Sequence, residues 1–283
     1  MSSFGKVVLN IVAQNMSAKY MTQSSNVSSE PLSDYLQEAL RVVEYARKKG
    51  VTLRVIGAAA LRIHCSNHIE LHKALGRELT DLDFVGYEKQ SEDIDKVFAD
   101  LGYDTKQYLS AMMDRGLRYR KFFYDRSNKR ICDIFLDRLE MCHVIEFEGR
   151  LEIDYPTVSL TDYLLAKMQI VKLNEKDVKD TIVLLIEHNI GDNDKETVNA
   201  DYISRLLAED WGFYHTFTTN LNKIRQRVDD FEVIPPQEKQ KLKLNLDLLL
   251  KAIEERPKSF KWKMRARIGT KQKWYNEVEE VVR

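Results

Sequence analysis

The chain has 283 residues, enough for one large domain or two smaller ones, and 43% of them are hydrophobic, an ordinary share for a folded core. Its 44 basic and 44 acidic residues balance, which argues against a uniformly basic nucleic-acid-binding protein. No apolar run approaches the roughly 20 residues that span a bilayer, and the short run over 7–13 is broken by Asn10, so we expect no membrane partner and no signal peptide. The three cysteines have no zinc-type spacing, which predicts a reduced protein in the cytoplasm.

In chain order, residues 1–32 form an N-terminal segment that ends in a polar, Ser-rich linker. The hydrophobic pattern then predicts helices and strands in turn: a helix from Ser33 to Gly50, a strand over 51–56, a helix from about Ala58 with a polar loop up to Leu79, a strand over 81–86 and a helix over 91–101. Two strand pairs follow, 118–124 with 130–136 and 144–147 with 151–153. After Pro156 all patterns are helical, over 160–173, 175–188, 197–208, 213–230 and 236–255. The chain therefore predicts an α+β fold, with a mixed β-sheet domain over 33–155 and an all-helical domain over 156–283.

Two carboxylates stand two residues apart in the predicted strand over 81–86. Alternate side chains of a strand share one face, so we expect Asp81 and Asp83 to project together. Such a pair repels unless a cation lies between its members, and Mg²⁺, which prefers oxygen ligands, is the simplest cation. The apolar strand over 130–136 offers a third acid, with Asp133 and Asp137 as the candidates.

These features occur in an informative order: an apolar strand, a turn of Gly and small residues into a helix, Asp-x-Asp, and an acid on a later strand. The arrangement resembles the signature of the DNA polymerase β-like nucleotidyltransferase superfamily, over roughly residues 50–190. In that superfamily the third acid lies mid-strand between apolar neighbours, which favours Asp133 and leaves Asp137 as a strand-end or capping residue. The chain departs from the superfamily at Gly57-Ala58, where Gly-Gly or Gly-Ser is usual. Ala58 has no hydroxyl for a phosphate, so the backbone N–H groups of the following helix are left to hold the anion.

The helices after Pro156 add to the resemblance. Residues 163–180 resemble the helix pair of AbiE-type toxin nucleotidyltransferases, in which a Lys and an (Arg/Lys)-Asp-x-x-Asp element approach the active site. The resemblance implies that Lys167 binds a triphosphate and that Asp177 lies near it, with Asp180 on the same helical face. The alternative is that these acids complement the helix dipole beside a cap at Asn174. Near the acid pair, Arg77 either contacts phosphate or braces the loop that carries Thr80.

Two further patterns are less specific. His64, His68 and His72 recur every four residues, and a loop lining the substrate cleft explains them better than a metal site, because no matching ligand cluster occurs elsewhere. Residues 256–273 contain eight Lys or Arg and no acid, interleaved with aromatic residues. Such a stretch suits phosphate contact with base stacking, or else it is a solvated basic helix whose aromatic side chains pack on the core.

The resemblance implies a nucleotidyltransferase-type sheet domain and a Mg²⁺-dependent enzyme. Such an enzyme moves a nucleoside monophosphate from a nucleoside triphosphate (NTP) to an acceptor hydroxyl and releases pyrophosphate. One or two Mg²⁺ ions are expected at the catalytic acids Asp81, Asp83 and Asp133. The expected nucleotide-binding residues are Gly57, Ala58, Arg77, Thr80, Lys167 and Asp177. RNA such as tRNA is the slightly favoured acceptor, bound through the basic C-terminus, and the protein is then a toxin with an antitoxin protein as partner. The alternatives are an antibiotic or other small-molecule nucleotidyltransferase and a non-catalytic nucleotide-binding or interaction module.

Overall fold

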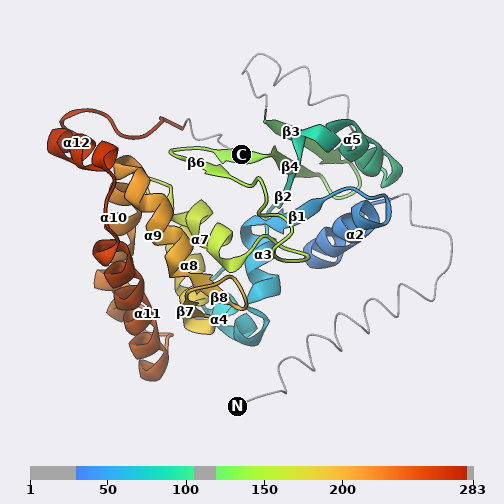
Figure 1. The fold of residues 1–283 in the computed structure, drawn as a ribbon. Helices are drawn as coiled ribbons and strands as arrows, with labels where there is room; N and C mark the ends of the chain where they lie inside the picture. Colours follow the sequence, from blue (N-terminus) through green and yellow to red (C-terminus); the bar gives the residue numbers. More distant parts are fainter. Residues whose placement is uncertain (1–29, 105–118, 279–283) are drawn as a thin grey trace.

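The computed structural model describes residues 30–104 and 119–278, and Figure 1 shows their arrangement. A mixed four-stranded sheet lies in the first half, with the strand order β1-β2-β4-β3. β2 runs antiparallel to β1 and parallel to β4, and β3 pairs antiparallel with β4 as the predicted hairpin. The strands are β1 (Leu53–Ile56), β2 (Leu82–Gly86), β3 (Arg120–Asp125) and β4 (Arg130–Leu136). Most of the predicted N-terminal segment, residues 1–29, lies outside the described residues.

Helices accompany the sheet strands largely where the sequence predicts them. They are α2 (Tyr35–Lys48), α3 (Gly57–His64), α4 (Ile69–Ala74) and α5 (Ser91–Asp100). The side chain of Asp34 caps α2 at the predicted start by accepting a backbone N–H of the first turn. The predicted polar loop before Leu79 is wrong in part, because it contains α4. Leu71 and His72 of this short helix are buried, although half of its residues are polar.

The second predicted strand pair has a different partner. β6 (Val144–Glu146) pairs antiparallel with β5 (Arg138–Glu140), and residues 151–153 form turns and a bend, so the predicted pairing is wrong. Asp137 causes the difference. It adopts a φ of 59° at the end of β4, and its carbonyl accepts the N–H of Phe147, so the chain turns at once into β5. Asp137 therefore ends its strand, as predicted.

The region after Pro156 is mostly helical, as predicted, but it is not all-helical. β7 (Asn189–Gly191) and β8 (Thr197–Asn199) form a small parallel pair. Each has 3 residues, too few for an alternating pattern to appear in the sequence. The helices are α7 (Leu160–Met168), α8 (Glu175–Glu187), α9 (Ala200–Glu209), α10 (Trp211–Arg227), α11 (Pro236–Glu255) and α12 (Phe260–Ile268). Short 3₁₀ helices occur at Ser66–His68, Glu88–Gln90, Val228–Asp230 and Gly269–Lys271.

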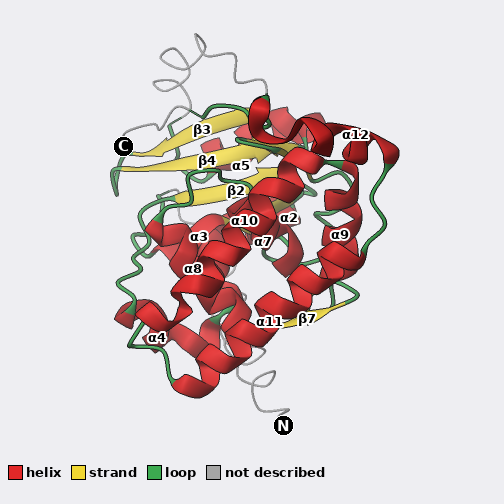
Figure 2. Cartoon of the chain, turned by 90° about the vertical axis from the view of Figure 1, so that its left-hand side faces the viewer, coloured by secondary structure: helices red, strands yellow, loops and turns green. Residues whose placement is uncertain are grey.

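Helix α3 connects the two halves. It packs against β1 and β2 and also against α7 and α8, and Figure 2 shows α3 and α8 side by side below β2. The buried apolar side chains form one core that extends from Ala39 in α2 to Ile253 in α11. None of the helices in the described ranges combines the length and the apolar character needed to cross a membrane. Strand β2, which carries Asp83, and the helices α7 and α8 thus pack on the same helix.

Candidate functional site

The predicted acids come from two neighbouring parallel strands. Asp83 in β2 and Asp133 in β4 are direct register partners, so their side chains lie on the same face of the sheet. Asp133 is 1% exposed, and Asp83 is half-buried. Asp81 lies one residue before β2, and the Thr80 hydroxyl donates a 3.4 Å hydrogen bond to its Oδ1. The structure thus brings Asp83 and Asp133 together, with Asp81 and Thr80 on the segment that leads into β2.

The backbone of the turn after β1 lies very close to one of these acids. Gly57 opens α3 with a φ of 72°, a left-handed conformation that L side chains rarely adopt. A Cβ at this position would overlap Oδ2 of Asp83 and lie 3.2 Å from its Cγ. Ala58 follows in the first turn of α3 and is half-buried. Only glycine therefore allows the backbone to approach the Asp83 carboxylate this closely.

Replacing Gly57 with alanine is expected to lower the free energy of unfolding by about 1–3 kcal/mol, because strain at the positive φ adds to the overlap with Asp83. Gly149→Ala is the matched control, since Gly149 has a φ of 67° and nothing within 4 Å of its added Cβ. Urea unfolding of both variants measures the difference. Equal losses in the two variants would mean that the contact with Asp83 does not constrain position 57.

Arg120 binds one of the acids, a contact that the sequence did not predict. Its Nε donates to Oδ1 of Asp133 at 2.7 Å, and its Nη2 donates to Oδ2. The rings of Phe122 and Phe135 flank the guanidinium, with centroids 4.7 and 4.9 Å away. Burial lowers the pKa of Arg120, but the hydrogen bond and charge of Asp133 and the charge of Asp83 raise it above its usual value. Arg120 is therefore a permanent cation beside the two acids.

A strand register explains how Arg120 reaches Asp133. In the β3–β4 pair Phe122 is opposite Asp133 and Arg120 is opposite Phe135, so the arginine lies diagonal to the acid on the same face. Diagonal neighbours in a sheet are within reach of long side chains. Prediction of the β3–β4 hairpin also predicts which residue lies opposite Asp133. An Arg two residues from that position is the signal that could have identified this pair.

Two predicted nucleotide-binding cations belong to a second, buried cluster. The Nζ of Lys167 lies 2.9 Å from Oδ1 of Asp177 and 2.9 Å from Oδ2 of Asp180. Arg77 binds Asp180 through two N–H groups, with Nε 2.5 Å from Oδ1 and Nη2 2.9 Å from Oδ2. The Tyr163 hydroxyl lies 3.5 Å from the same Oδ2. Asp180, and not the predicted Asp177, is the centre of this cluster.

The charges of the cluster stabilise one another. Burial raises the pKa of Asp180, but Lys167 and Arg77 outweigh it and hold the pKa below its usual value. Burial lowers the pKa of Lys167, but Tyr163, Asp180 and Asp177 raise it well above its usual value. Asp180 and Lys167 are therefore both ionised near neutral pH. Asn174 caps α8 by accepting the N–H of Asp177, as the alternative reading of these acids predicted.

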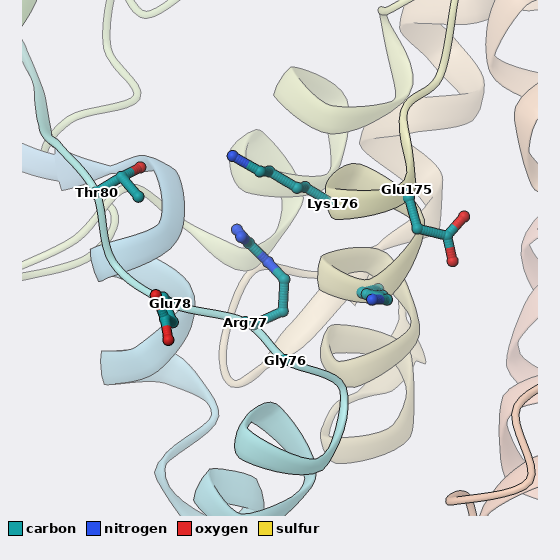
Figure 3. A pocket seen from close by; sticks show the side chains of 7 residues that line it. Gly76, Arg77, Glu78, Thr80, Glu175 and Lys176 are labelled. Carbon is teal, nitrogen blue, oxygen red and sulfur yellow. The ribbon is translucent and has the colours of Figure 1, made fainter. Parts of the chain in front are cut away.

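A cavity of about 290 Å³ opens beside the cluster, between the segment after α4 and the first turns of α8 (Figure 3). Its lining residues are Gly76, Arg77, Glu78, Thr80, Glu175, Lys176 and Lys179. Thr80 directly precedes Asp81, so the cavity reaches the segment that carries the acid pair. It therefore adjoins the buried cluster through Arg77 and ends at the residue before Asp81.

The three regularly spaced histidines do not share a site. His64 contacts the Val158 carbonyl and the Thr157 hydroxyl, each at 2.9 Å, and Nδ1 of His68 lies 2.7 Å from Glu187. His72 is buried in α4. The predicted cleft loop is wrong, because these residues lie in short helices. Within residues 30–104 and 119–278, no group of three His, Cys, Asp or Glu side chains is arranged as a metal site.

The basic C-terminal stretch divides into packed and exposed residues. Trp262 meets Tyr214 edge-on at 5.0 Å between ring centroids, and Arg265 donates to the carbonyls of Gly269 and Gln272 at 2.7 and 2.8 Å. The exposed cations of α12 are Lys261, Lys263 and Arg267. Phe260 is 80% exposed, so it is the aromatic side chain of α12 that can contact a partner.

Comparisons of the chain with protein-family models, with curated proteins and with solved structures gave no match. Support for a function therefore comes from the acids, the paired cations and the cavity, together with the resemblance in the sequence. The acids offer only oxygen ligands, which suit Mg²⁺. Arg120 already donates hydrogen bonds to the Asp133 carboxylate, so Asp133 would share this carboxylate between Arg120 and a metal ion.

Proposed function

We propose that the chain is a Mg²⁺-dependent nucleotidyltransferase that transfers a nucleoside monophosphate from an NTP to an acceptor hydroxyl. The observation that supports it most is the register pairing of Asp83 with Asp133, beside the glycine turn that presses on Asp83. Two carboxylates at paired positions on one face of neighbouring strands repel each other unless cations compensate them. Packing alone does not require charges at these two positions, since apolar side chains would fill the same sites at lower cost.

Each residue has a role in this proposal. Asp81, Asp83 and Asp133 hold one or two Mg²⁺ ions, and Gly57 and Ala58 let the N–H groups of α3 approach a phosphate. Bound Mg²⁺ supplies the positive charge that stabilises the leaving pyrophosphate. Asp133 takes the proton of the acceptor hydroxyl, whose oxygen forms a bond to the α-phosphorus while the bond to pyrophosphate breaks.

RNA such as tRNA is the acceptor that we favour, and a toxin with an antitoxin partner is the matching biological role. The supporting observation is the exposed set Lys261, Lys263 and Arg267 on α12, next to exposed Phe260. Cations contact the phosphates of RNA, and an aromatic ring stacks on a base. A small-molecule acceptor, such as an antibiotic, would not need this surface.

One observation favours a second candidate, a non-catalytic nucleotide-binding module. Arg120 already neutralises Asp133, and Ala58 lacks the hydroxyl that the superfamily usually has. Such a module would bind an NTP without transferring any part of it. Transfer activity separates the two candidates.

The experiment incubates the protein with Mg²⁺, each NTP labelled at the α-phosphate, and total cellular RNA. Label is expected in RNA, and Asp81→Asn or Asp83→Asn is expected to abolish it while the melting temperature stays equal or rises, because like-charge repulsion is relieved. Asp137→Asn is the matched control, an acid on the strand end that should keep full activity. Full activity in Asp83→Asn would rule out the metal assignment, and label in small molecules or protein would change the acceptor.

A further inference from the structure

We propose that the cavity between Gly76–Thr80 and α8 is a polyphosphate-binding subsite, which takes the terminal phosphates of the NTP. The inference rests on the proposed function for its ligand. Arg77, Lys176 and Lys179 supply three cations to the lining. Figure 3 shows Arg77 and Lys176 extending toward the same space in front of the loop with Thr80, while the carboxylate of Glu175 points away from it.

The acids around the cavity are paired with other cations. Glu175 accepts a 2.9 Å bond from Arg227, and Asp177 and Asp180 are held by Lys167 and Arg77. The remaining acid of the lining, Glu78, is exposed. Within the described ranges, Lys176 and Lys179 make no ion pair and no hydrogen bond through Nζ. The cavity lining therefore has two ammonium groups without an ion-pair partner among the described residues, against the single carboxylate of Glu78.

Arg77 is held rigidly in the wall by the buried cluster. Two of its five N–H groups bind Asp180, which leaves the others for a ligand in the cavity that it lines. Lys167 holds Asp180 from the other side and is itself saturated by two carboxylates. Lys167 is thus a positioning residue that fixes Arg77 through Asp180, and Lys176 and Lys179 contact the phosphates in its place.

The size and lining of the cavity select the ligand. Its volume of about 290 Å³ lies at the lower limit of the roughly 300–1,000 Å³ that enclose a whole small molecule. The lining contains no aromatic side chain on which a base could stack. A di- or triphosphate group fits this space, and the neighbouring Thr80 and Asp81 lie where the rest of the nucleotide continues toward the acids.

Calorimetric titration of the full chain with inorganic tripolyphosphate, without metal, tests the subsite. The variant Lys176→Ala/Lys179→Ala is expected to raise the Kd at least tenfold, because each charge-assisted hydrogen bond contributes about 1.5–3 kcal/mol and 1.4 kcal/mol is a factor of ten. The control is Lys195→Ala/Lys223→Ala, which removes the same charge from exposed positions elsewhere and should leave the Kd unchanged. Melting temperatures check that both variants are folded.

Two further arms separate this inference from the proposed function and from an RNA-binding role. Asp83→Asn should keep tripolyphosphate binding even though it loses transfer, so the two claims fail independently. An unchanged Kd in Lys176→Ala/Lys179→Ala, or no binding by the wild type, would overturn the subsite. The subsite is also overturned if the double variant weakens binding of a single-stranded oligoribonucleotide but not of tripolyphosphate, because the cavity then contacts an RNA backbone.

Discussion

Replacing Lys167 with methionine should lower the free energy of unfolding by about 3 kcal/mol at neutral pH, the lower end of the effect of breaking a buried ion pair. The Lys167 ammonium lies 2.9 Å from a carboxylate oxygen of both Asp177 and Asp180, and Asp180 is 1% exposed. The variant leaves Asp180 buried with Arg77 alone. Urea unfolding at pH 7 measures the loss, and Lys223→Met, the same change at an exposed position, should cause none.

A double variant tests the electrostatic cause of that loss. Lys167→Met with Asp177→Asn should recover part of the stability, because the second change removes a carboxylate that has lost its partner. The loss in Lys167→Met should also shrink at acidic pH. The ion pair of the wild type requires Asp180 to be ionised. Because the pKa of Asp180 is lowered in the folded protein, the ion pair stops contributing to stability only as the pH falls through that lowered pKa. A loss that is independent of pH and of Asp177 would show that Lys167 contributes packing only.

Replacing Arg120 with methionine should destabilise the metal-free protein by about 3–5 kcal/mol, because Asp133 is almost fully buried and loses its bidentate partner beside Asp83. Mg²⁺ should restore much of that stability if the acids bind it. A ligand at a hundred times its Kd stabilises the folded state by about 2.7 kcal/mol. Thermal unfolding with increasing Mg²⁺ measures the recovery, which should be larger in the variant than in the wild type.

The control for this experiment is Arg126→Met in the same hairpin. Arg126 is 66% exposed and pairs with Asp104, so its loss should leave both the stability and its Mg²⁺ dependence close to the wild type. Failure of Mg²⁺ to stabilise Arg120→Met would mean that the arginine is the permanent counter-ion of the acids. The case for a metal at Asp83 and Asp133 would then be lost.

The sequence predicted the sheet region because its strands are apolar runs bounded by turns. The mid-strand position of Asp133 and the strand-end position of Asp137 both followed from the pattern in one strand. The Arg120–Asp133 pair did not, since it depends on the register of two strands. The same limit applies to β5 and β6, whose pairing follows from the positive φ of Asp137.

The cations near the proposed nucleotide site show a second limit. The sequence identified Lys167, but a residue type does not reveal whether its charge is already paired. Two acids of the next helix, α8, pair with Lys167, and the unpaired ammonium groups beside the cavity are those of Lys176 and Lys179. Similarly, Trp262 and Phe260 are both aromatic residues in a basic stretch. Only the structure distinguishes them, because Trp262 packs on Tyr214 whereas Phe260 is exposed.

The position of the label in the NTP tests the central claim most directly. The purified chain is incubated with Mg²⁺, total cellular RNA and an NTP labelled at either the α- or the γ-phosphate. A nucleotidyltransferase transfers the α-phosphate and releases the other two as pyrophosphate. We therefore expect product labelled from the α-position only, and none from Asp83→Asn. Label transferred from the γ-position, or equal α-label transfer by Asp83→Asn, would contradict the account.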